Sequence, residues 1–209
     1  PFKDSSLADP PPFLSLWGSA PWIHLPTISV VGSRDPNRLT TLWLETHFSD
    51  FLHRKNVAVV SGGARGIDSA AHVLSLRCRR PTVVFLPSGL AHPYPEDWRR
   101  LKSQVIDGGG AIVSTYSPFM TVRRHHFEQR NRWIAGMGKI VFVVEARRRS
   151  GSSMTARIAR EIDITVCCLP GPPGDPRCAG TVDLLFEGAF PIRDARDLEV
   201  LMNVYQPGQ

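Results

Sequence analysis

The stretch Val60-Ser-Gly-Gly-Ala-Arg-Gly-Ile-Asp-Ser-Ala-Ala-His72 decides the predicted fold, because an apolar run gives way to glycines and then to a helical pattern. Residues 57–60 (VAVV) have the composition of a buried strand, and residues 67–76 have helical spacing. The three glycines between them remove side chains from the turn. A strand, a bare turn and a helix N-terminus present unpaired N–H groups and a positive dipole end to an anion. The stretch therefore predicts an anion-binding turn in an α/β fold.

Strands alternate with helices along the rest of the chain. Short apolar runs predict strands at residues 27–31, 57–60, 82–86, 111–114, 139–145 and 164–169. Helical patterns are predicted at 39–54, 67–77, a stretch of about ten residues after 98, 127–137, 153–162, 181–187 and 195–202. This alternation is typical of a doubly wound α/β fold, with a mainly parallel sheet and helices on both faces.

The chain is predicted to hold one domain, at residues 27–203, between two less regular ends. Residues 1–26 contain six prolines, and we expect a proline-rich N-terminal arm that packs on the domain without regular structure of its own. Residues 204–209 are expected to be a frayed tail. Because residue 1 is Pro rather than Met, we expect a truncated chain.

Composition favours a globular protein with an anionic partner. The 209 residues are 42% hydrophobic, and 25 Lys and Arg against 19 Asp and Glu give a formal charge of +6. Membrane-length apolar stretches and a signal peptide are not apparent, so we expect a cytoplasmic protein with no membrane partner. The four cysteines form no C-x-x-C pair, which favours reduced thiols over a metal site.

The loops after the predicted strands share glycine, serine and arginine. They are residues 32–34 (GSR), 61–66 (SGGARG), 88–89 (SG) and 146–152 (ARRRSGS), together with the basic run 123–126 (RRHH). Ligands of such sheets bind beyond the carboxyl ends of the strands. We therefore expect one basic, glycine-lined rim that holds the phosphates of a nucleic acid.

Other nucleotide sites are disfavoured, and several residues have two interpretations. The glycine turn lacks the Lys and Ser/Thr of a Walker A loop. The second strand does not end in the acidic residue that would bind the ribose of a dinucleotide, so no cofactor is expected.

Asp68 is expected to complement its helix N-terminus, and His72 to be a packing histidine. Arg130 is expected either to bind a carboxylate such as Glu145 or to contact phosphate. Residues 147–149 form either a solvated turn or a source of charge for the ligand.

Seven motifs in order resemble the DprA/Smf family of DNA-processing proteins. They are VVGSR (30–34), VVSGGARGIDSAAH (59–72), SGL…YP (88–95), AIVSTYSP (111–118), FEQRNRWIAG (127–136), VVEARRRSGSSMTAR (143–157) and LPG (169–171). The resemblance implies an extended Rossmann-like, homodimeric domain that is not an enzyme. It also implies binding and protection of single-stranded DNA, and handover of that DNA to the RecA recombinase in natural transformation.

Family motifs also imply which residues contact DNA. Carried over by motif position, they are Gly32, Ser33, Arg34, Ser61, Gly62, Gly63, Arg65, Gly66, Ser88, Gly89, Arg124, Arg130, Asn131, Arg132, Ser150, Gly151, Ser152 and Thr155. Arg124 stands where the family usually has lysine, and Glu128 near the site would weaken phosphate binding. Base stacking is expected from Phe119, His125 or His126.

Two rival functions stay open on the residues alone. One is a nucleotide-binding enzyme, such as a nucleoside-monophosphate N-glycosidase of a related Rossmann-like family. Such enzymes usually carry a Pro-Gly-Gly-x-Gly-Thr-x-x-Glu motif, and its helical glutamate is missing after Gly62-Gly63 here. The other is a protein scaffold whose basic rim meets an acidic partner.

Overall fold

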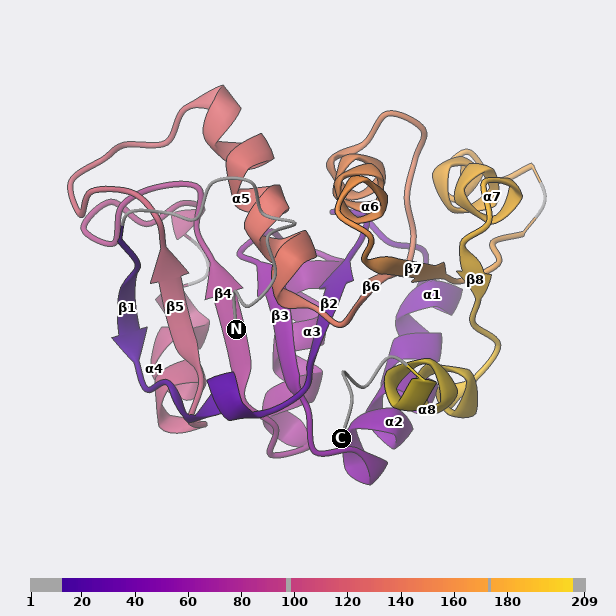
Figure 1. Ribbon diagram of the computed structural model, residues 1–209, viewed down its shortest axis with the longest axis horizontal. Coiled ribbons are helices and arrows are strands. Elements are labelled where there is room, and N and C mark those ends of the chain that lie inside the picture. The colour runs from indigo at the N-terminus through magenta and orange to yellow at the C-terminus, as the bar shows by residue number, and fades with distance from the viewer. Residues whose placement is uncertain (1–12, 97–98, 173, 205–209) are drawn as a thin grey trace.

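An eight-stranded sheet forms the middle of the computed structural model, which describes residues 13–96, 99–172 and 174–204 (Figure 1). Its strands are β1 (Ser15–Gly18), β2 (Thr27–Val31), β3 (Ala58–Gly62), β4 (Thr82–Phe85), β5 (Ala111–Ser114), β6 (Ile140–Val143), β7 (Thr165–Cys168) and β8 (Phe190–Pro191). Their order across the sheet is β1-β5-β4-β3-β2-β6-β7-β8. Among the described strands only β1 pairs antiparallel. The predicted mainly parallel sheet is confirmed.

Helices cover both faces of this sheet. They are α1 (Arg38–Trp43), the π-helical η2 (Leu44–Phe48), α2 (Ser49–Arg54), α3 (Ile67–Arg77), α4 (Arg99–Asp107), α5 (Arg124–Met137), α6 (Gly151–Glu161), α7 (Ala179–Phe186) and α8 (Ala195–Val204). Helices α5, α6 and α7 pack on one face, and the others on the opposite face (Figure 1). Strand residues alternate between the two sides: Val83 and Phe85 contribute to the core under α5, and Val84 to the core under α4. Burial on both faces explains why the strands are apolar throughout.

The strand order reverses between β2 and β6. The chain runs from β2 through β3 and β4 to β5, and α5 then carries it back across the sheet to β6, which pairs with β2 from Ile28↔Ile140 to Val31↔Val143. In doubly wound sheets this reversal is where ligands bind, beyond the carboxyl ends of the strands. The loops after β2, β3 and β6 all lie at this place.

The prediction that residues 1–26 lack regular structure is wrong for the described part. Ser15–Gly18 forms β1 and pairs with β5, and Pro21–His24 forms a 3-10 helix, η1, with Trp22 buried. Residues 1–12 and 205–209 lie outside the described residues, while α8 extends to Val204. The two-residue strand β8 was not predicted at all. Both edge strands depend on a partner strand, which a local pattern does not reveal.

Three helices begin earlier than their patterns predict. Helix α6 begins at Gly151 because Ser150 acts as its N-cap, accepting the Ser153 N–H at 3.2 Å. Helix α5 begins at Arg124, where the backbone N–H of Arg123 donates to His126 Nδ1 at 3.2 Å. Helix α7 begins at residue 179. The basic run 123–126 therefore enters a helix instead of ending a loop.

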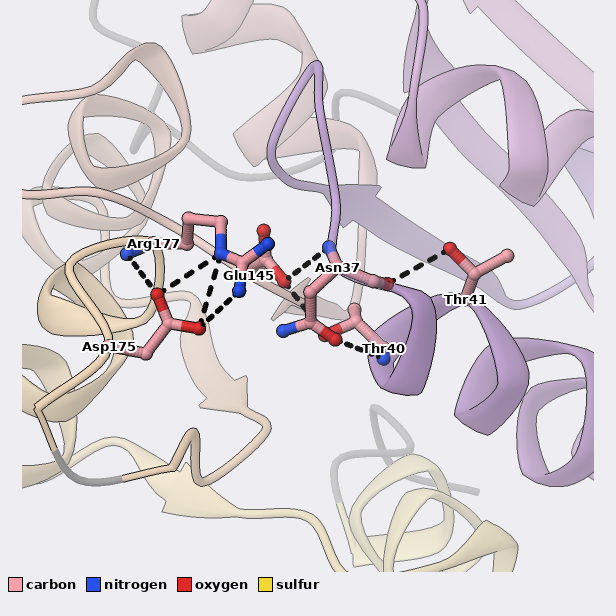
Figure 2. Close-up of polar contacts among 6 residues, drawn as sticks. All are labelled: Asn37, Thr40, Thr41, Glu145, Asp175 and Arg177. Atoms are coloured by element: carbon pink, nitrogen blue, oxygen red, sulfur yellow. Dashed lines mark hydrogen bonds and ion pairs between the residues drawn. The ribbon is translucent and has the colours of Figure 1, made fainter.

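A buried carboxylate holds the loop after β2. Glu145, just past β6, is fully buried and accepts the Asn37 N–H at 3.1 Å and the Thr40 hydroxyl at 2.8 Å. Asn37 in turn caps α1 by accepting the Thr40 N–H at 2.8 Å. Figure 2 shows Glu145 between this cap and the Asp175–Arg177 ion pair. The expected pairing of Glu145 with Arg130 is wrong, because this carboxylate faces α1.

We predict that Glu145→Ala lowers the free energy of unfolding by about 2 kcal/mol, because the Asn37 N–H and the Thr40 hydroxyl lose their acceptor inside the protein. Urea denaturation measures this change. Glu161→Ala, at an exposed position at the end of α6, is the control and should be close to neutral. Equal losses in both variants would contradict the role assigned to Glu145.

Candidate nucleic-acid interface

Hydrogen bonds join the loops after β2, β3 and β6 at the reversal of strand order. The Ile67 N–H, at the start of α3, donates to the Ser33 carbonyl at 3.0 Å. The Ser152 hydroxyl, at the start of α6, donates to the Gly32 carbonyl at 2.8 Å. The expected meeting of these loops at one edge of the sheet is therefore confirmed.

Most glycines of the rim make room for other parts of the protein. A Cβ on Gly62 would lie 1.6 Å from Nη1 of Arg130, and one on Gly66 would lie 2.3 Å from the Ser33 carbonyl oxygen. Gly66 also has a φ of +81°, which favours glycine. At Gly32 and Gly89, too, neighbouring protein atoms occupy the space that a Cβ would need. The close approach that we expected of phosphate at these four glycines is instead made by protein atoms.

A cavity of about 240 Å³ opens beside the glycine turn. Its walls include Gly63 and three arginines, Arg34, Arg65 and Arg130, together with the rings of Tyr94 and Phe127. The two rings meet edge to face with centroids 5.8 Å apart, and the Arg130 guanidinium carbon lies 6.0 Å from the Phe127 centroid. We call this cavity the arginine–aromatic pocket. Positive charge beside aromatic surface suits a ligand that carries both phosphate and a base.

Sequence reasoning missed the aromatic wall of this pocket. Tyr94 and Phe127 fall within the motifs at 88–95 and 127–136, but neither was among the predicted contacts. Each ring is a single aromatic residue far from the glycine turn in sequence. Only the packing of α5 against the loop after β4 brings them together.

Arg130 is a buried cation with an incomplete set of partners. Its side chain is 8% exposed, its Nη1 lies 4.0 Å from Asp68 Oδ2, and its Nε has no hydrogen-bond partner among the described residues. Burial lowers the pKa of Arg130, and the nearby Asp68 carboxylate opposes that shift. A buried cation with an unpartnered donor is costly, so the wall of the pocket carries a positive charge that Asp68, at 4.0 Å, compensates only in part.

Asp68 shares the desolvated environment of Arg130. Burial raises the pKa of Asp68 to about 6, and this shift is only partly opposed by Arg130, by hydrogen bonds from the Ala64 backbone and the Ser61 side chain, and by Arg34. A carboxylate with this pKa changes its charge just below neutral pH. Above this pKa, Asp68 partly compensates the charge of Arg130, and below it the compensation is lost.

His72 is a packing histidine, as predicted. Its Nε2 lies 2.8 Å from the Gly62 carbonyl oxygen and its Nδ1 lies 2.6 Å from the Thr82 hydroxyl. Burial lowers the pKa of His72 to about 4, which keeps the ring neutral at pH 7. The ring holds the end of β3 in place below Arg130.

Several predicted contact hydroxyls are used inside the protein. Ser61 donates to the Val30 carbonyl at 2.6 Å, and Thr155 to the Gly151 carbonyl at 3.0 Å. Ser88 is fully buried and its hydroxyl accepts the Tyr94 N–H at 3.1 Å. These hydroxyls position the loops and the pocket wall, so their side chains are not directed at a ligand.

Consecutive residues of α5 point in different directions, as the 3.6-residue period requires. Arg130 reaches the pocket, Asn131 is buried and donates to the Gly151 carbonyl at 3.4 Å, and Arg132 is exposed to solvent. Arg124 is exposed at the start of the helix, apart from the pocket lining. The predicted contacts on this helix therefore do not converge on one point.

One of the expected stacking residues is unavailable. His126 is buried, stacks on Tyr116 with ring centroids 4.2 Å apart, and has its Nδ1 3.1 Å from the Pro87 carbonyl oxygen. The expectation that it stacks on a base is wrong, because these contacts already occupy the ring. His125 and Phe119 are exposed.

Comparison with known proteins identifies the family. The profile of the DNA recombination-mediator protein A family matches residues 1–203. The chain belongs to this family. It is 35% identical to protein Smf of Escherichia coli strain K12 over 91% of the chain and 50% of that protein. The resemblance drawn from the seven motifs is thus confirmed.

Solved DprA structures share the fold. DprA from Streptococcus pneumoniae superposes with a TM-score of 0.82 at 33% identity, covering 90% of this chain and 65% of that one. DprA from Helicobacter pylori, described for its single-stranded-DNA binding mode, superposes with a TM-score of 0.85 at 26% identity, covering 96% and 92%. The extended Rossmann-like fold is confirmed. This chain spans only half the length of the Escherichia coli relative.

We predict that Gly62→Ala lowers affinity for a fluorescent thymidine oligonucleotide about tenfold, because the new methyl group would displace the Arg130 guanidinium. Fluorescence anisotropy measures the affinity. Gly108→Ala is the matched control, since its Cβ would also meet a side chain, Leu76 Cδ2 at 2.6 Å, but away from the pocket lining. Equal affinities of the two variants would contradict the importance of Arg130.

The pKa of Asp68 predicts a pH dependence. As the pH falls from about 7.5 to about 5.5, Asp68 gains a proton, and the loss of its negative charge beside Arg130 should strengthen oligonucleotide binding about tenfold. Asp68→Asn should bind more tightly at the higher pH and lose this part of the pH response. The two proteins differ only at position 68, so identical pH profiles would exclude Asp68 as the cause.

Proposed function

We propose that this protein binds and protects single-stranded DNA without sequence preference and hands it to the RecA recombinase in natural transformation and recombination. The observation that carries the binding proposal is Arg130, a buried guanidinium with an unpartnered Nε in the wall of a pocket. A phosphate in the pocket would supply the negative charge that Asp68, 4.0 Å from Nη1, provides only in part. Membership of the DNA recombination-mediator family and the single-stranded-DNA binding described for the Helicobacter pylori relative support the same ligand.

The pocket suits a nucleotide of any base. Arg34 and Arg65 are exposed at its mouth, where they can attract and neutralise the phosphate backbone. Tyr94 and Phe127 offer aromatic surface, which every base can contact through its π-face. Bases stacked between neighbouring pairs inside a duplex do not expose such faces, so the pocket favours a single strand.

Handover to RecA, a homodimeric state and a cytoplasmic location are proposed from the family resemblance. Candidate contact surfaces are an edge strand and the apolar residues of the last helix, Leu198, Val200 and Leu201. Leu198 and Leu201 are buried against the domain, whereas Val200 is 58% exposed and Val204 is 66% exposed. If α8 contributes to a dimer or to a RecA contact, it does so through these two valines.

Catalysis is not part of the proposal. The carboxylate nearest the pocket is Asp68, whose raised pKa is a property that catalytic acids also show. Asp68 is 9% exposed and directed at Arg130, and it does not line the cavity. An N-glycosidase needs a carboxylate at the sugar. Incubation with AMP should therefore release no adenine, and release that Asp68→Asn abolishes would establish the enzyme instead.

We predict that Arg34→Ala and Arg124→Ala each weaken binding of a thymidine oligonucleotide, Arg34→Ala about tenfold and Arg124→Ala less, because only Arg34 lines the pocket. Each lost phosphate contact should reduce the salt dependence, the slope of log affinity against log salt, by about 0.7. Anisotropy at several salt concentrations measures both quantities.

Arg77→Ala is the control, since this exposed arginine ends α3 at the opposite edge of the sheet. It should leave binding unchanged. A duplex of equal length should bind much more weakly than the single strand. Unchanged affinity in the Arg34 variant, or a duplex bound as tightly as the strand, would overturn the proposed pocket.

A further inference from the structure

A second cavity lies between α6 and α7, away from the arginine–aromatic pocket. It has a volume of about 140 Å³, and the residues that matter in its walls are Arg148, Arg149, Ser153, Arg157, Asp183 and Glu187. We call it the α6–α7 cleft. The walls of the cleft thus carry three arginines and two carboxylates, and a ligand can bind only those arginines that the carboxylates do not pair.

The backbone of the cleft is fixed before any ligand arrives. The Ser153 hydroxyl donates to the Arg147 carbonyl at 2.8 Å, and the Gly180 N–H donates to the Ala146 carbonyl at 2.7 Å. Arg149 is held in the left-handed region with a φ of +54°, a conformation that non-glycine residues rarely adopt. Such a conformation persists only where the surroundings enforce it, and it is common at ligand sites.

Ion pairs neutralise both carboxylates but leave two arginines over. Arg148 binds Asp183 through two hydrogen bonds, at 2.7 and 2.8 Å, and Arg160 binds Glu187 at 2.6 Å. Arg149 and Arg157 are exposed, and within the described residues neither has a hydrogen bond or an ion pair. Arg157 also helps to lower the pKa of Asp183, so it is partly compensated, but four arginines, Arg160 included, against two carboxylates leave the cleft with a net positive charge.

The start of α6 connects the cleft to the pocket. Ser152 is bonded to the loop that carries Arg34, and Gly151 is exposed, with no atom closer than 4.0 Å to the place where a Cβ would lie. A phosphate backbone can pass close over this glycine, at a helix N-terminus whose dipole favours negative charge. On one side of Gly151 lies the pocket, and on the other lie Arg149 and Arg157.

We propose that the α6–α7 cleft is a second phosphate subsite, in which Arg149 and Arg157 bind the backbone of the same DNA strand after it leaves the arginine–aromatic pocket and crosses Gly151. This inference rests on the proposed function. The inference adds a direction to the proposed DNA binding. The strand runs from the loop after β3, over the N-terminus of α6, toward α7.

Binding measured against strand length tests the subsite. The double variant Arg149→Gln and Arg157→Gln should bind a thymidine oligonucleotide of about 4 nucleotides as the wild type does, because such a strand fills only the pocket. With about 20 nucleotides its affinity should fall about tenfold, and the salt slope should lose about 1.4, the share of two phosphates.

A matched control comes from the opposite edge of the sheet. Arg77→Gln and Arg79→Gln also remove two exposed charges, and Arg79, like Arg149, has a left-handed φ, of +55°. This variant should match the wild type at every length. An equal loss in the control, an equal loss at short and long lengths, or no loss in the cleft variant would each overturn the subsite. Failure of the wild type to bind any strand would overturn the proposed function itself.

Discussion

The guanidinium of Arg130 occupies the space above Gly62, and the site is built around this contact. Arg130 comes from α5, the helix that returns the chain across the sheet, and Gly62 ends β3. Any side chain at position 62 would collide with it. Asp68 is too far away to complete its hydrogen bonds, and His72 holds the Gly62 carbonyl from below. The folded protein thus keeps a desolvated cation with an unused donor, and an anion bound in the pocket would offset the cost of its burial.

The contact between Arg130 and Gly62 shows that the glycine-rich loops serve mainly to let parts of the protein approach one another. A turn with three glycines usually suggests that a ligand lies against bare backbone. Here the missing side chains let loops and α5 approach one another: Arg130 lies over Gly62, and the Ser33 carbonyl lies against Gly66. The glycines bring the loops of several strands into contact, and arginine and aromatic side chains then face the ligand. Gly63 and Gly151 are the exceptions, since a Cβ at either would meet nothing closer than an ordinary contact.

The sequence predicts the features that depend on neighbouring residues, and it fails where a feature depends on contacts between distant parts of the chain. Six strands were found because strands buried on both faces are apolar at every position, and the loops could be grouped because parallel strands end at the same edge. Strand β1 was missed because Ser15–Gly18 is a strand only beside β5. The partner of Arg130 was misjudged for a similar reason. Glu145 and Asp68 are equal candidates in sequence, and it is packing that directs Glu145 toward Asn37 and leaves Asp68 beside Arg130.

The net charge of +6 is a poor measure of how strongly this surface attracts phosphate. Arg148, Arg160, Arg177 and Arg193 each have a carboxylate oxygen within 2.8 Å. Such exposed pairs add little stability, and they also remove these charges from competition for a ligand. A charge in water is screened within about 10 Å, whereas a charge in a desolvated wall interacts several times more strongly with a nearby anion. On the proposed function, Arg130 should therefore contribute more to affinity than any exposed arginine, and the exposed arginines should act mainly in attracting the strand and in directing its path beyond the pocket.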